Sequence, residues 1–177
     1  DYLHTANVGR AHLDQRAVVV GSSRDDLRGG LDRLARGGGT TGTRPRGAAR
    51  PLAFLFTGQG SQHVGMGRSL YETLPVYRRA LDECAALLAG EGLLDVPLLE
   101  VLWGAHQDRL DETACTQPAL FSLQRALYET WTSWGIEPAA VAGHSIGEYM
   151  AAVAAGMVSW PDALRLVAAR GRLMQSL

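Results

Sequence analysis

Residues 141–156, VAGHSIGEYMAAVAAG, place a serine between two glycines, in the pattern Gly143-His-Ser145-Ile-Gly147. An apolar, strand-like run precedes the pattern and an alanine-rich, helix-like run follows it. This context is typical of a nucleophile elbow, a strained turn that exposes a serine hydroxyl at the end of a strand. We therefore expect Ser145 to be a nucleophile. The alternative is a chance pattern in a chain rich in glycine and alanine.

Outward from this turn, strand-like runs alternate with helix-like runs, which is typical of a parallel α/β sheet. The fold class that we predict is α/β, with an α/β-hydrolase-like parallel sheet. The expected elements are a strand at Leu52 to Phe56, a helical region from Leu70 to Leu88 interrupted near Pro75, a helix from Thr116 to Trp134, and a strand at Ile136 to Ala142.

Two packing expectations follow from these elements. The strand at Leu52 to Phe56 is apolar at every position, which predicts a central strand covered on both faces. The helix that ends before Gly135 carries Trp131 and Trp134, and we expect both indole rings to belong to the core.

The first fifty residues have a different composition. A short strand is expected at Arg16 to Val20, followed by a helix from Ser23 to Arg36 with Ser23 as its N-cap. Gly37 to Arg50 is rich in Gly, Thr and Arg, which is typical of a linker. We predict a small α+β segment at residues 1–50 and a second unit at residues 51–177.

Composition narrows the class of protein. The 177 residues are 46% hydrophobic and 20% charged with a net charge of −1, which favours a globular chain and does not suggest a nucleic-acid or membrane partner. Cys84 and Cys115 form neither a disulfide framework nor a metal-ligand spacing, so we expect no bound metal or other cofactor and a cytoplasmic location.

The residues beside Ser145 suggest how charge would be stabilised. The backbone N–H of Ile146, at the start of the next helix, is a candidate oxyanion donor. His144 is not assigned as the base, because neighbouring side chains on a tight turn point in different directions. His4, His12, His63 and His106 all precede the serine, whereas an elbow enzyme places its base histidine after the nucleophile.

Arg170 is the most unusual residue of the last predicted helix, which begins after the expected N-cap Ser159. A helical wheel places Arg170 in the middle of an apolar stripe. The stripe consists of Ala163, Leu166, Val167, Met174 and Leu177. A guanidinium there needs a partner, so Arg170 either pairs with an internal acid such as Glu148, extends to solvent near Gly171, or binds the carboxylate of an acyl substrate.

Four motifs in this order resemble a known family. FLFTGQGSQHVGMG, TQPALF, GHSIGEYMAAVAAGMVS and LVAARGRLMQ together are similar to malonyl-CoA:acyl carrier protein transacylases, in particular to the acyltransferase domains of polyketide synthases. The similarity runs from about Pro51 to Leu177. Residues 1–50, with HTANVGRAH, resemble the linker between a ketosynthase and its acyltransferase.

The resemblance implies a mechanism. Ser145 would accept an acyl group from acyl-CoA and pass it to the phosphopantetheine thiol of an acyl carrier protein. The backbone N–H of Gln59 would be the second oxyanion donor beside that of Ile146. Arg170 would bind the free carboxylate of the extender unit, with His144 and Gln59 as further substrate-binding residues. Ile146 is the kind of residue seen in malonyl-selective members.

Three further expectations remain. The family's catalytic histidine, its specificity motif and its small subdomain lie further downstream, so we expect this stretch to be the N-terminal portion of an acyltransferase and inactive alone. Adjacent partners would be a ketosynthase domain and an acyl carrier protein. The alternatives are a serine hydrolase or thioesterase, which needs no buried arginine, and a non-catalytic docking fragment.

Overall fold

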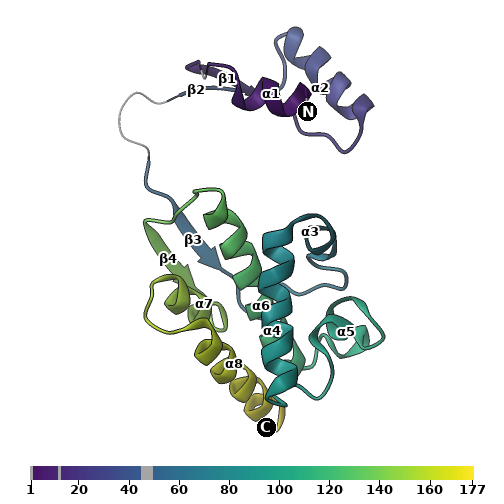
Figure 1. Cartoon of the computed structure of the whole chain (residues 1–177), viewed down its shortest axis with the longest axis vertical. Coiled ribbons are helices and arrows are strands. Elements are labelled where there is room, and N and C mark those ends of the chain that lie inside the picture. Colours follow the sequence, from purple (N-terminus) through teal and green to yellow (C-terminus); the bar gives the residue numbers. More distant parts are fainter. Residues whose placement is uncertain (1, 12, 45–49) are drawn as a thin grey trace. The chain divides into compact units, whose positions relative to one another are not determined.

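A computed structural model describes residues 2–11, 13–44 and 50–177 (Figure 1). The chain divides into two compact units, Asp1–Arg50 and Pro51–Leu177. His12 and residues 45–49 of the expected linker lie outside the described residues.

The first unit is a small α+β segment. It contains α1 (Tyr2–Val8), β1 (Gln15–Val18), α2 (Arg24–Ala35) and β2 (Thr40–Thr43). The helix α2 begins as expected: the Ser23 hydroxyl accepts a hydrogen bond from the N–H of the third helical residue, whose carboxylate accepts one from the Ser23 N–H. This capping box fixes the start of α2.

The linker expected at Gly37 to Arg50 is partly wrong, because it contains the strand β2. β2 pairs antiparallel with β1, with Gln15 opposite Thr43 and Val18 opposite Thr40. Threonine is β-branched and favours extended backbone, and β1 supplies the hydrogen-bonding partner that composition alone does not reveal.

The second unit contains a parallel pair of strands, β3 (Ala53–Phe56) and β4 (Ala140–Gly143), with Phe56 beside Gly143 in the register (Figure 1). The α/β fold class with a parallel sheet is therefore confirmed. The expectation that the first strand is covered on both faces is wrong for the described residues. Phe56 is 8% exposed, whereas Leu55, on the opposite face, is 77% exposed.

Helices make up most of the second unit. They are α3 (Arg68–Thr73), α4 (Pro75–Gly90), α5 (Leu98–Trp103), the 3-10 helix η1 (Gln107–Arg109), α6 (Thr113–Ser133), α7 (Gly147–Ala154) and α8 (Trp160–Gln175). α6 packs against α4 and α8, and α7 contacts both strands. The expected interruption near Pro75 is confirmed, because Pro75 begins a new helix.

A buried arginine joins three of these helices. Arg125 of α6 is 3% exposed, and its guanidinium pairs with Glu83 of α4 at 2.5 Å and with Glu129 at 2.6 Å. The same guanidinium lies over the ring of Trp160 in α8, 3.7 Å from the ring centroid. Two carboxylates and an aromatic face together offset the cost of burying the charge.

The prediction that Trp131 and Trp134 belong to the core is wrong. Their exposed fractions are 44% and 57%, and the two rings form an edge-to-face pair with centroids 5.3 Å apart. Trp131 lies in the last turn of α6 and Trp134 is its C-cap, and Thr130 is the last buried residue of the helix. Trp131 lines a surface depression together with Leu55 of β3.

Within the residues that the structure describes, no helix combines the length and the apolar run needed to cross a bilayer. No metal-binding cluster of His, Cys, Asp and Glu side chains occurs in the same residues. Cys84 and Cys115 are buried free thiols.

Candidate active site

Ser145 lies in the sharp turn between β4 and α7. Its φ angle is +53°, and it is the one non-glycine residue with a positive φ among those described. Residues other than glycine rarely adopt a positive φ angle, because their Cβ atom then crowds the backbone. The strained conformation at the end of a parallel strand is the geometry of a nucleophile elbow, in which the hydroxyl stands clear of both elements.

The two glycines of the motif have a steric reason. A Cβ atom on Gly143 would meet the carbonyl group of Gly147, and a Cβ on Gly147 would meet the carbonyl groups of Phe56 and Thr57 at the end of β3. These neighbours are backbone atoms, which cannot move aside as a flexible side chain would. Only glycine therefore allows the elbow to pack this closely against the adjacent strand.

Ile146 follows the serine at the N-cap position of α7, and its side chain is fully buried. Its backbone N–H donates no hydrogen bond to any described residue. An unoccupied N–H at the positive end of a helix favours an anionic ligand. The group is thus free to bind an oxyanion beside Ser145.

Gln59 lies in the loop that follows β3, and this loop reaches the elbow. The N–H of His144 donates to the Phe56 carbonyl at 3.0 Å. A Cβ on Gly58 would lie 2.5 Å from Nδ1 of His144. The side-chain Nε2 of Gln59 donates to Oγ1 of Thr113 at 3.3 Å, while its backbone N–H has no acceptor in the described part of the chain. Gln59 thus offers a second free backbone donor at this sheet edge.

His144 is exposed and packs against Gly58. Its imidazole makes no hydrogen bond to Ser145. Of the other described histidines, His4, His63 and His106, none makes a hydrogen bond to Ser145. The structure therefore supplies no histidine base for the Ser145 hydroxyl from these positions.

Arg170 and Ser145 lie together. Nη2 of Arg170 donates a hydrogen bond to Oγ of Ser145 at 3.2 Å, although Ser145 lies in the turn before α7 and Arg170 lies within α8. The arginine side chain is half-buried on α8. α8 begins as predicted, with the Ser159 hydroxyl accepting from the Asp162 N–H at 3.3 Å.

The predicted apolar stripe of α8 is partly wrong, because the buried face of the helix is rotated about the helix axis from the predicted position. The buried face consists of Ala163, Leu164, Val167, Ala168 and Gly171, and Leu166, Met174 and Leu177 are exposed. Gly171 explains the difference, because a Cβ there would lie 3.0 Å from the Thr113 carbonyl oxygen. α8 therefore approaches α6 along its small residues, which a wheel of side-chain hydrophobicity ignores. Arg170 lies at the margin of this face, not in its middle.

The internal acid considered for Arg170 does not bind it. Glu148 is exposed, and no carboxylate forms an ion pair with Arg170 in the parts of the chain that the structure describes. A half-buried guanidinium without an anionic partner, directed at a strained serine, can receive a carboxylate from outside.

Sequence reasoning missed the residues that support the Gln59 loop. Gln62 donates through Nε2 to Oδ1 of Asp111 at 2.9 Å and accepts the Gly60 N–H through Oε1 at 2.7 Å. A signal was present, because the motif GQGSQ contains two glutamines and only the first was given a role.

Comparisons with known proteins identify the family. The family description "Acyl transferase domain" matches residues 53–177. The spectinabilin polyketide synthase system protein NorB of Streptomyces orinoci is 50% identical over 185 residues, covering 100% of this chain and 8% of that protein. Polyketide synthase GfsB of Streptomyces halstedii is 48% identical over 184 residues, covering 99% of this chain and 3% of that protein. The chain thus spans a small part of these relatives.

Solved structures show the same fold. The acyltransferase domain from the second module of the salinomycin polyketide synthase superposes with a TM-score of 0.79 at 46% identity, covering 93% of this chain and 38% of that one. The acyl transferase domain of ZmaA superposes with a TM-score of 0.84 at 35% identity, covering 96% and 40%. By its sequence, its fold and its elbow, the chain belongs to the acyl transferase domain family, in the form found in polyketide synthases.

Proposed function

We propose that this chain is part of an acyltransferase that moves a malonyl-type extender unit from CoA to the phosphopantetheine thiol of an acyl carrier protein. The observation that carries the proposal is the 3.2 Å hydrogen bond from Nη2 of Arg170 to Oγ of Ser145. This contact supports the proposal because a cation able to bind a carboxylate lies beside a strained hydroxyl, and a hydrolase of neutral acyl esters does not need such a cation.

The first half-reaction forms an ester on Ser145. Oγ attacks the thioester carbonyl carbon, the C–S bond breaks, and the CoA sulfur leaves with the proton that the hydroxyl loses. The resemblance to the family implies that a histidine further along the polypeptide carries this proton. In the second half-reaction the carrier-protein thiol attacks the ester carbonyl carbon, the C–O bond to Ser145 breaks, and the proton lost by the thiol passes to Oγ of Ser145.

The backbone N–H groups of Gln59 and Ile146 stabilise the oxyanion of each tetrahedral intermediate. Both donors are unoccupied, so they need not break other hydrogen bonds when the charge develops. Loss of one such donor typically slows acyl transfer by about 10²- to 10³-fold.

Arg170 selects the acyl group. Its guanidinium binds the free carboxylate of a malonyl unit while the other end of that unit is esterified to Ser145. His144 and Gln59 are assigned as further substrate-binding residues, as the resemblance to the family implies. Malonyl is favoured over methylmalonyl because Ile146 follows the nucleophile, as in malonyl-selective members that the sequence resembles.

The partners follow from the same assignment. Acyl-CoA is the donor and an acyl carrier protein is the acceptor; one solved relative is a malonyl-transacylase in complex with its acyl-carrier protein. Residues 1–50 serve as the linker to a ketosynthase domain, and residues 51–177 are the N-terminal portion of the large acyltransferase subdomain. The protein needs no bound cofactor and acts in the cytoplasm.

Intact mass spectrometry of the full-length protein tests the proposal. After incubation with malonyl-CoA, the wild type gains the mass of one malonyl group, and Ser145→Ala does not. Ser176→Ala, which changes the exposed C-cap serine of α8, is the control and retains the adduct. An adduct on the Ser145→Ala protein would exclude this nucleophile.

A further inference from the structure

The loop after β3 leaves one of two neighbouring N–H groups free. The Gly60 N–H donates to Oε1 of Gln62 at 2.7 Å, whereas the preceding N–H, that of Gln59, has no acceptor in the described part of the chain. Gly60 has a φ angle of +107°, a conformation that is accessible to glycine. Of these two successive backbone donors, the Gly60 N–H is therefore used within the loop and the Gln59 N–H remains free.

The Gln62 side chain is held at both ends of its amide. While Oε1 accepts from Gly60, Nε2 donates to Oδ1 of Asp111 at 2.9 Å. A carboxylate accepts only, so Asp111 fixes which end of the amide faces it, and the oxygen must face Gly60. The orientation that captures the Gly60 N–H is thus set by a residue 49 positions away in the sequence.

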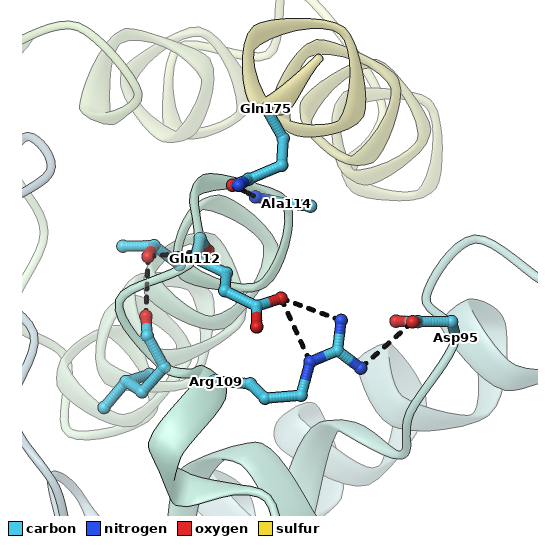
Figure 2. Close-up of polar contacts among 7 residues, drawn as sticks. Asp95, Arg109, Glu112, Ala114 and Gln175 are labelled. Atoms are coloured by element: carbon cyan, nitrogen blue, oxygen red, sulfur yellow. Dashed lines mark hydrogen bonds and ion pairs between the residues drawn. The ribbon is translucent and has the colours of Figure 1, made fainter.

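The segment that carries Asp111 is itself anchored. Nε and Nη2 of Arg109 donate to Oε2 of Glu112 at 3.0 and 2.8 Å, and Nη1 donates to Oδ2 of Asp95 at 3.0 Å (Figure 2). The hydrogen bonds to Glu112, which have the largest effect, and the bond to Asp95 raise the pKa of Arg109 above its ordinary value. In the sequence, Asp111 therefore lies between two residues that are joined by two hydrogen bonds to a single carboxylate oxygen.

The helix of Arg170 rests on the same segment. Oε1 of Gln175 accepts a hydrogen bond from the Ala114 N–H at 3.4 Å (Figure 2), and Gly171 packs against the Thr113 carbonyl. Thr113 also accepts from the Gln59 side chain. The start of α6 is therefore a common support for the Gln59 loop and for the end of α8.

We propose that Gln62 is a positioning residue for the oxyanion site, held in register by Asp111. By occupying the Gly60 N–H, the Gln62 amide fixes the loop turn that directs the Gln59 N–H toward the oxyanion. This inference rests on the proposed function. It predicts that Gln62 affects the rate of ester formation and not the recognition of the malonyl carboxylate, which Arg170 performs.

A charge-transposed pair tests the inference in the full-length protein. In Gln62→Glu, the new carboxylate faces that of Asp111. Repulsion between the two charges moves the side chain at position 62 away from the Gly60 N–H. In the double variant Gln62→Glu with Asp111→Asn, the new amide donates to the new carboxylate, so the hydrogen bond between positions 62 and 111 is restored with reversed polarity, and the Gly60 N–H again donates to an oxygen at position 62. Asp111→Asn alone keeps an acceptor oxygen, and Gln15→Glu repeats the charge change in the first unit as a control.

The readout is the single-turnover rate of Ser145 malonylation, measured beside the KM for malonyl-CoA and the melting temperature. We expect Gln62→Glu to slow ester formation by about 10- to 100-fold, less than full loss of an oxyanion donor, with KM nearly unchanged. The double variant recovers to within a few fold of wild type, Asp111→Asn slows ester formation less than Gln62→Glu because it keeps an acceptor oxygen, and the Gln15→Glu control remains close to wild type. An unchanged rate in Gln62→Glu, or no recovery in the double variant, would overturn the inference.

Amide hydrogen exchange separates this inference from the proposed function. The Gly60 amide should exchange faster in Gln62→Glu and regain protection in the double variant, whatever reaction Ser145 performs. If the wild-type protein is not malonylated while Gly60 exchange still differs among the variants in this way, the proposed function is contradicted and the assignment of the loop is supported. Equal Gly60 exchange in all variants would refute the role of Gln62.

Discussion

Replacing Arg170 with alanine tests the assignment of the extender carboxylate. Nη2 of this residue lies 3.2 Å from Oγ of Ser145, and no described acid pairs with it. Truncation therefore removes the proposed substrate partner without leaving an internal carboxylate uncompensated. We expect the melting temperature to change little while substrate preference changes strongly.

The size of the effect follows from the environment of the guanidinium. A hydrogen bond to a charged group contributes about 1.5–3 kcal/mol, which corresponds to about 10- to 150-fold in a rate ratio. Because the Arg170 side chain is half-buried, water screens part of the interaction, and we expect the lower part of this range.

The assay compares kcat/KM for malonyl-CoA with kcat/KM for acetyl-CoA in the full-length protein. Arg170→Ala should lower the malonyl-to-acetyl ratio by about 10- to 50-fold, chiefly through the malonyl value. Arg170→Lys keeps the charge but loses the planar two-pronged geometry, so it should fall between wild type and alanine. Arg172→Ala is the matched control on the exposed side of α8. A ratio that stays at the wild-type value in Arg170→Ala would refute the assignment.

Three further outcomes are expected. Gly147→Ala should lower the free energy of unfolding by about 1–3 kcal/mol, because the new Cβ meets backbone carbonyls of β3; an unchanged melting temperature would contradict this. The hydrogen bond from Arg165 holds the pKa of Glu91 below its ordinary value, so its stabilisation is present at neutral pH and lost as the pH falls through that lowered pKa. Stability curves of wild type and Arg165→Gln should thus differ at pH 7 and converge in acid, and parallel curves would refute the pairing. Burial raises the pKa of Cys115 to about 11 and also raises that of Cys84, so neither thiol should react with Ellman's reagent at pH 8 before unfolding. Rapid labelling of folded protein would contradict their burial.

The sequence was sufficient for features determined by local geometry. The G-x-S-x-G pattern located the turn at Ser145, and the caps at Ser23 and Ser159 located two helix starts, because each depends on residues close together in the chain. The parallel pairing of the two strands also followed from the alternation of elements along the sequence.

Features determined by contacts between distant elements could not be predicted in this way. The rotation of α8 depends on the close approach of Gly171 to α6, and β2 depends on β1 as its partner. From the sequence alone, an arginine such as Arg125 is expected to be exposed to solvent. In the structure it is buried, because glutamates of α4 and α6 pair with its guanidinium. The role of Gln62 required a contact with Asp111 that no spacing in the sequence reveals.

The proposal that a nucleophile, two oxyanion donors and a guanidinium contact one acyl group can be tested directly. The measurement is a crystal structure of the full-length acyltransferase trapped as its malonyl ester. We predict ester density on Ser145, a carbonyl oxygen within hydrogen-bonding distance of the Gln59 and Ile146 N–H groups, and a carboxylate bound to Arg170. An ester on another residue, or a carboxylate directed into solvent away from Arg170, would contradict the account.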